Sequence, residues 1–411
     1  MDIKAKIQEI KKSLEPLAIP TKEDEETLTE TAQEIKAKIS SLVDDEVEIV
    51  FCGSYAKGTW LRGSEELDIF LRFPLGYTEK EMIEYLKKRL MAPLNLSVRH
   101  ASRDYLHGRF KGVEIEIIPV YKIEDPKQAK HIMDFTYFHT KYINQVLSKE
   151  EKNEVRILKK YLKTINCYGA ESHIEGFSGY VCELLISTYK TFERTLLSLI
   201  SSRQPIFIDP AKYYDDLEKA KVKLKEKIKD CPLIIIDPIF EERNASKSLS
   251  KETFTKFIVK TLINIDVLPK PKELRSITLE TNKFDDELIV ASKLKSITKK
   301  IVSELTNNKY YVLYYDVFIK DKIVSEIKYY DLDFNEIIEK EGPKLWMLDA
   351  MVNFINKNKS NIYGYVPIKE RFYFFLGRDR NIDHILSNRI KSIASNSKYT
   401  DLIDNLVIKY E

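Results

Sequence analysis

The feature that most constrains this sequence is an apolar stretch that runs directly into a glycine turn. Residues 47–52 read as a β-strand, and Gly53-Ser54 follows without a linker and opens a helical segment. The free backbone N–H groups and the helix dipole at such a turn favour an anion, as in several phosphate-binding folds. The sequence therefore predicts an α/β unit with a phosphate site at this turn.

A P-loop is the alternative kind of phosphate-binding turn. In a P-loop the second glycine is followed by Lys and then Ser or Thr, because the lysine reaches the phosphates and the hydroxyl binds Mg²⁺. In this chain Gly58 is followed by Thr59-Trp60. The sequence therefore does not support a P-loop.

Acidic residues lie on two strands downstream of the turn. Glu66 and Asp68 are two residues apart at the head of the strand expected at 67–73, so their side chains leave one face with Cα atoms roughly 6.6 Å apart. Glu114 and Glu116 share a face of the alternating strand 113–121. Inward-facing acids are costly unless they meet cations. Three such carboxylates around two Mg²⁺ ions would suit nucleotidyl transfer, although a lone Glu-x-Asp is more often a solvated strand end.

Length and composition favour several domains. The 411 residues suggest about three domains, and the net charge of +3 confines any nucleic-acid site to a local patch. The four cysteines stand far apart, as expected in a reducing compartment. Apolar stretches are shorter than the roughly 18 residues that span a bilayer, and the first residues have no signal-peptide core. We expect a soluble, cytoplasmic protein with no membrane partner.

Periodicity predicts how the rest of the chain is organised. Further strands are expected near 94–99 and 113–121, and a helix at 79–90. The middle of the chain is mainly helical, with its strongest helical patterns at 154–165 and 178–198. Beyond Pro269 and Pro271, which mark a boundary, residues 310–318 and 322–330 read as a hairpin.

An ordered series of motifs resembles a known family. The motifs are Gly53-Ser54-Tyr55-Ala56-Lys57, Glu66-x-Asp68, the run 112–119, the run 153–159, Tyr168-Gly169-Ala170-Glu171, the run 176–185 and Asp237-Pro238 with Arg243-Asn244. They resemble the nucleotidyltransferase superfamily and, within it, the archaeal class I CCA-adding enzymes, or tRNA nucleotidyltransferases. The resemblance implies an α+β multidomain fold. Its parts would be a nucleotidyltransferase (polymerase-β-like) head with a mixed sheet at 1–145, a helical neck for nucleotide recognition at 146–255, and a body and tail at 256–411 that bind the acceptor and T arms of tRNA.

The resemblance also implies a reaction and its residues. CTP or ATP would be added to the tRNA 3′ end without a template, to build or repair CCA, with release of pyrophosphate and with two Mg²⁺ ions. The implied metal-binding catalytic residues are Glu66, Asp68 and Glu116, and the implied nucleotide-binding residues are Gly53, Ser54, Lys57, Thr136, His139, Lys159, Tyr168 and Arg243. Of these, Arg243 would help to select the base. The family usually has Asp in place of Glu116 and Arg in place of Lys57, so both positions depart from its pattern.

Several alternatives stay open at this point. Without the resemblance, Lys159 reads as part of a solvated helix face, His139 and Tyr168 read as packing residues, and Arg243 is as readily a salt bridge. The chain could be a terminal adenylyl- or uridylyltransferase for other RNA, a small-molecule nucleotidyltransferase, or an RNA-binding module with a decayed head. A homodimer is one option for its assembly. The RNA-backbone candidates in the last segment are Lys369, Arg371, Arg378 and Arg380 beside Tyr373 and Phe374.

Overall fold

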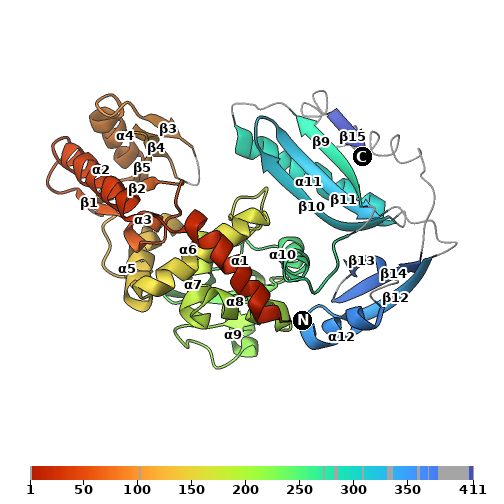
Figure 1. Cartoon of the computed structure of the whole chain (residues 1–411). Coiled ribbons are helices and arrows are strands. Elements are labelled where there is room, and N and C mark those ends of the chain that lie inside the picture. The colour runs from red at the N-terminus through yellow and green to blue at the C-terminus, as the bar shows by residue number, and fades with distance from the viewer. Residues whose placement is uncertain are drawn as a thin grey trace.

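The computed structural model describes residues 2–100, 103–271, 274–281, 286–307, 310–330, 337–358, 362–368, 370–377 and 407–410. Within these residues, sheets at either end of the molecule flank a mainly helical middle (Figure 1). The expected α+β multidomain fold is confirmed. Among these residues, no helix combines the length and the apolar character that a membrane span requires.

The N-terminal part is built on a mixed sheet in the order β1-β2-β5-β4-β3. Its strands are β1 (Glu48–Phe51), β2 (Glu66–Phe73), β3 (Ser97–Arg99), β4 (Tyr105–Phe110) and β5 (Val113–Tyr121). Strands β2 and β5 run parallel at its centre, and the other neighbours are antiparallel. The strand predicted at 113–121 is confirmed, whereas β4 was not predicted.

The two faces of this sheet differ because β2 and β5 alternate apolar and polar residues. One face carries Leu67 and Ile69 into an apolar core. This core is closed by α2 (Lys22–Ser40) and α4 (Glu79–Leu86). The opposite face carries the acidic residues, beside the short helix α3 (Gly53–Lys57). The catalytic candidates therefore lie outside the core of the sheet.

Helices form the middle of the molecule. They are α5 (Thr136–Val146), α6 (Lys149–Thr164), α7 (Gly179–Tyr189), α8 (Phe192–Ser201) and α10 (Lys251–Asn264). A small sheet, formed by β6 (Ile206–Ile208), β7 (Leu233–Asp237) and β8 (Phe240–Asn244), adjoins them together with α9 (Leu217–Leu224). The buried aromatic residues Tyr161, Phe177, Phe192, Phe254 and Phe257 belong to one core that these helices share.

Helix α1 (Ile3–Ala18) packs against this helical middle, although it precedes the first sheet in the sequence. Its buried Ile7 and Leu14 belong to the core of the middle helices, and α1 contacts α6 and α8 (Figure 1). The Gln8 amide also donates to Glu193 on α8 at 2.7 Å. The chain therefore joins the first sheet to the middle helices on both sides, before β1 and after β5.

Two further sheets follow. The first has the order β10-β11-β9-β15 and comprises β9 (Arg275–Thr281), β10 (Tyr311–Ile319), β11 (Ile323–Tyr330) and β15 (Val407–Tyr410), with α11 (Glu287–Asn307) packed on it. The second has the order β12-β14-β13 and comprises β12 (Ile337–Lys344), β13 (Ile362–Ile368) and β14 (Arg371–Gly377), with α12 (Leu348–Asn358). The predicted hairpin is confirmed as β10 and β11.

The RNA-backbone candidate in the last segment is only partly described. Lys369, Arg378 and Arg380 lie outside the described residues. Arg371 pairs with Glu341, and Phe374 is fully buried in the core. A buried ring cannot stack on RNA, so Phe374 adds no stacking surface beside these basic residues.

Candidate active site

The turn at Gly53 is built around the Asp68 side chain. Strand β1 ends at Phe51, and Gly53 begins α3 with a φ of +60°. A Cβ atom on Gly53 would lie 1.6 Å from Asp68 Oδ2, so no other residue fits without displacing that carboxylate. The following residue, Ser54, lies in the first turn of the same helix. The turn therefore meets the acidic face of β2 directly.

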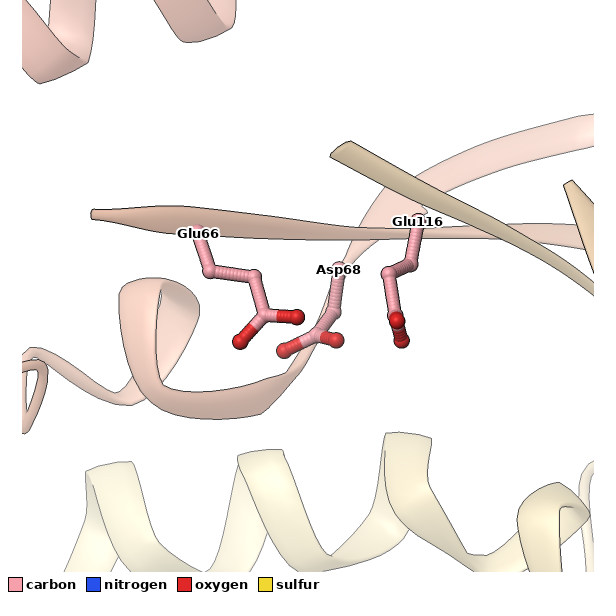
Figure 2. Close-up of side chains that lie close together, drawn as sticks. All are labelled: Glu66, Asp68 and Glu116. Carbon is pink, nitrogen blue, oxygen red and sulfur yellow. The ribbon is translucent and has the colours of Figure 1, made fainter. Parts of the chain in front are cut away.

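Parallel pairing of β2 and β5 brings the third acid to the first two. In this register Asp68 lies opposite Glu116 and Glu66 lies opposite Glu114. Figure 2 shows Glu66, Asp68 and Glu116 pointing to the same side of the sheet and toward one another. One carboxylate oxygen of each lies within 4.8 Å of the other two. Glu114 instead pairs with Arg109 at 2.9 Å and is half-exposed. This pairing separates Glu114 from Glu116, which strand alternation alone had placed on the same face.

The three carboxylates repel one another in a water-poor setting. Burial, and then the neighbouring Asp68 charge, raise the pKa of Glu66 and of Glu116 to about 7. Burial also raises the pKa of Asp68, while the Lys57 charge opposes that rise. Oxygen ligands gathered in this way suit a hard divalent cation, whose charge would remove the repulsion. The chain thus carries a carboxylate cluster that fits a divalent metal site.

Two lysines beside this cluster are buried and share one partner. Lys57 Nζ donates to Glu183 Oε2 at 2.9 Å, and Lys159 Nζ donates to Glu183 Oε1 at 3.1 Å. Thr59 Oγ1 donates to the same Oε1 at 2.6 Å. Lys159 is 2% exposed, so the interpretation of a solvated helix face is wrong. A Cβ atom on Gly179 would lie 3.1 Å from the Tyr168 hydroxyl and 3.4 Å from Lys159 Nζ, which places Tyr168 beside Lys159.

A second buried carboxylate, Asp237 at the end of β7, contacts residues from three other elements, α5, α7 and β8. Its Oδ2 contacts His139 Nε2 at 2.9 Å and accepts from Arg243, and its Oδ1 accepts from the Tyr180 hydroxyl at 3.1 Å. Burial alone would raise the pKa of Asp237, but the hydrogen bond and charge of His139 and the charge of Arg243 hold it at about 2. Thr136 precedes His139 by three residues on α5 and so lies on the same side of that helix.

The two groups of nucleotide candidates adjoin each other through Tyr180. Its ring centroid lies 4.2 Å from that of His139, and Lys57 Nζ lies 5.2 Å from the same Tyr180 ring. The structure therefore brings the carboxylate cluster, the lysine pair and the Asp237 group into one continuous site. Arg243 forms an ion pair with Asp237, the alternative to base selection in the sequence analysis, and its side chain is 25% exposed.

Comparison with known proteins shows which family this chain belongs to. Residues 32–143 match the family model of the nucleotidyltransferase domain, and residues 153–267 match that of the tRNA nucleotidyltransferase second domain. The CCA-adding enzyme of Nanoarchaeum equitans is 33% identical over 66% of this chain and 70% of its own length. That of Methanocaldococcus jannaschii is 30% identical over 92% of this chain and 89% of its own length. The chain belongs to the family of archaeal CCA-adding enzymes.

Coverage differs among the relatives in this CCA-adding family. The enzyme of Archaeoglobus fulgidus is 37% identical over 62% of this chain, and the match spans 54% of that relative's length. Among solved structures, Escherichia coli CdnC with ATP is 18% identical, with a TM-score of 0.46 over 64% of this chain and 90% of that chain. The share of this chain that the three relatives match thus ranges from 62% to 92%.

Two residues of this candidate site were not singled out from the sequence. Glu183 and Asp237 appeared there only inside longer motifs, although each is the shared partner of several candidate residues. The signal for Glu183 was present, because it is the one charged residue in the helical stretch Gly179–Tyr189. A lone charge within an apolar helix must find buried partners. Asp237 follows the apolar run 233–236 in the same way.

Proposed function

We propose that this protein adds or repairs the 3′-terminal CCA of tRNA, without a nucleic-acid template, using CTP and ATP and releasing pyrophosphate. Its membership of the CCA-adding family supports the reaction class. The observation that carries the proposal for this chain is the convergence of three carboxylate oxygens within 4.8 Å of one another. Nucleotidyl transfer by two metal ions needs such a set beside a triphosphate site.

The roles that we propose for the chain's own residues follow from their positions. Glu66, Asp68 and Glu116 would hold two Mg²⁺ ions, which supply charge neutralisation and activate the attacking hydroxyl when bound. Lys57, Lys159 and Tyr168, with Gly53 and Ser54 at the turn, would bind the triphosphate. The nucleobase would meet Thr136, His139 and Arg243. Positioning and electrostatics would then supply most of the catalysis, without a covalent nucleophile on the protein.

We also propose a separate role for each of three parts of the chain. Residues 1–145 would form the catalytic head, residues 146–255 a neck that recognises the nucleotide, and residues 256–411 a body and tail that bind the acceptor and T arms of tRNA. Support comes from the separate sheets at the two ends of the molecule and the helical middle between them (Figure 1). The homodimer and the cytoplasmic location stay predictions.

Product analysis tests the proposal. The protein is incubated with Mg²⁺, tRNA lacking its 3′-terminal CCA, and each labelled nucleoside triphosphate alone and in combination. We expect addition of two C residues from CTP and then one A residue from ATP, with nothing added from UTP or GTP. Long tails of A or U on this tRNA would instead indicate a terminal adenylyl- or uridylyltransferase. Pyrophosphate release that needs no RNA acceptor would indicate a small-molecule enzyme.

A further inference from the structure

Glu183 on α7 connects two lysines that come from different parts of the chain. Lys57 ends α3 in the first part, and Lys159 lies on α6 in the middle. Each carboxylate oxygen of Glu183 accepts from one of these ammonium groups, at 2.9 Å and 3.1 Å. The three side chains are 8% exposed or less. A single carboxylate therefore fixes the separation of two cations at the edge of the metal site.

The orientation of this carboxylate is itself fixed. Thr59 is fully buried, and its hydroxyl donates to Glu183 Oε1 at 2.6 Å. Lys159 Nζ also lies 3.1 Å from the Thr59 carbonyl oxygen and 3.0 Å from its hydroxyl. The loop after α3 thus holds both the lysine and the carboxylate, so the geometry does not depend on long, free side chains.

Charge explains why such a carboxylate is needed. Two ammonium groups placed side by side in a buried setting repel each other, and without a counter-charge one of them would turn away or lose its proton. Lys57 also acts on the other side, because its charge opposes the upward pKa shift of Asp68. Lys57 therefore lies between Glu183 and the carboxylate cluster, and Glu183 joins Lys159 to it.

We propose that Glu183 is a positioning residue that holds the ammonium groups of Lys57 and Lys159 together, ready to receive the nucleotide triphosphate. This inference rests on the proposed function, because it assumes that the two lysines bind the triphosphate. It goes further by assigning a role to a residue that does not itself contact the nucleotide. The alternative is that Glu183 only joins two parts of the fold.

A matched control for that alternative exists in the same chain. Asp316 on β10 is also a buried carboxylate between two lysines, accepting from Lys256 and from Lys260 at 2.9 Å. It joins the third part of the chain to α10, away from β2 and β5 (Figure 1). Removing its charge should disturb the fold in a comparable way without touching the nucleotide site.

The test compares the affinities of ATP and AMP for the full-length protein with Mg²⁺ and without RNA. In Glu183→Gln we expect ATP affinity to fall about 10²-fold, because both ammonium groups lose the charge that holds them in place, with AMP affinity unchanged. Asp316→Asn should leave both affinities unchanged. An equal loss for ATP and AMP in Glu183→Gln, or wild-type affinity for both, would overturn the inference.

A milder variant keeps the test decisive if Glu183→Gln does not fold. Thr59→Val removes the bond that orients Glu183 and the bond from Lys159 Nζ to the same hydroxyl, but it leaves all buried charges paired. It should weaken ATP binding several-fold and leave AMP binding unchanged. Equal effects on ATP and AMP would again overturn the inference, as would a wild-type protein that binds AMP as tightly as ATP. Wild-type protein that prefers ATP but adds no CCA to tRNA would contradict only the proposed function.

Discussion

The carboxylate of Asp68 occupies the space that a side chain on Gly53 would need: a Cβ atom there would lie 1.6 Å from Asp68 Oδ2. The backbone of the glycine turn therefore packs directly against the acidic strand and forms one side of the candidate metal site. Two features that the sequence showed separately thus depend on each other.

Gly53→Ala should abolish most of the nucleotide transfer. The new methyl group would push the Asp68 carboxylate out of the cluster, and we expect a loss of at least about 10²-fold in the rate of single-turnover incorporation. The positive φ adds about 1–2 kcal/mol of destabilisation, measurable by urea unfolding.

Gly63→Ala is the control for that backbone strain. Gly63 has a φ of +73° but no atom within 4 Å of its Cβ position. The Gly63→Ala variant should lose a free energy of unfolding comparable to that lost by Gly53→Ala and should keep the wild-type rate of nucleotide transfer. Equal activity losses in the two variants would contradict the proposed contact between turn and carboxylate.

The length of the acid at position 116 should matter less than its charge. The register of β2 and β5 places Glu116 opposite Asp68. Glu116→Asp should therefore retain the rate of transfer within about tenfold, whereas Glu116→Gln should lose at least about 10²-fold. Glu114→Gln is the matched control, because Glu114 lies on the same strand but pairs with Arg109. Steady-state incorporation of CTP measures all three. A larger loss of activity in Glu114→Gln than in Glu116→Gln would show that Glu114, and not Glu116, is the third metal ligand.

Magnesium affinity should rise with pH near neutrality. Without metal, Glu66 and Glu116 have pKa values of about 7, raised from 4.5. The folded, metal-free protein therefore binds more protons than the unfolded chain between these values, and its stability should fall as pH rises through that window. Mg²⁺ competes with these protons, so its apparent affinity should be greater at about pH 8 than at about pH 6.

Calorimetric titration in two buffers of different ionisation enthalpy measures the protons that Mg²⁺ releases. Glu116→Gln should release fewer protons than wild type near pH 7, and Glu114→Gln should match wild type. Magnesium binding with no proton release at this pH would show that the carboxylates are already ionised, against the burial that we describe.

Asp237→Asn should relax the choice of base without weakening the triphosphate site. Asp237 Oδ2 contacts both His139 and Arg243, and its Oδ1 accepts from the Tyr180 hydroxyl. An amide carries no charge to pair with Arg243, and its NH₂ group turns a donor toward one side of this group. We expect the ratio of CTP to UTP incorporation to fall by about tenfold, and protein stability to fall as well, because breaking a buried charge pair leaves its partner unpaired. ATP binding without RNA should stay within a few-fold of wild type. An unchanged CTP to UTP ratio would contradict this role.

Sequence patterns predicted the central elements because their periodicity is strong. Strand β5 alternates buried and half-buried residues along its first half, and the hairpin of β10 and β11 pairs along most of its length. Strand β4 was missed because Leu106 is its one fully buried residue, so no alternation is visible from Tyr105 to Phe110. The packing of α1 on the middle helices could not be predicted, since an amphipathic face does not say which core it joins.

The acidic residues of the candidate site could be predicted from the sequence, but the contacts that join its residues to one another could not. Glu66 and Asp68 could be placed on one face by spacing alone. Spacing left Glu114 and Glu116 open, the family resemblance selected Glu116, and the register of β2 and β5 places Glu116 opposite Asp68. Glu183 meets Thr59 and Lys57 across 124 and 126 residues of sequence, and Asp237 meets His139 across 98 residues. Such contacts leave no local pattern in a single sequence.

The most direct test of the central claim is single-turnover incorporation of labelled CTP and ATP into tRNA lacking CCA by the Asp68→Asn variant, with tRNA binding measured in parallel. This substitution keeps the size of the side chain beside Gly53 and removes the charge from the cluster. We expect a loss of at least about 10³-fold in transfer, as for removal of a principal electrostatic group, with tRNA affinity within a few-fold of wild type. Transfer at the wild-type rate by Asp68→Asn would contradict the central claim.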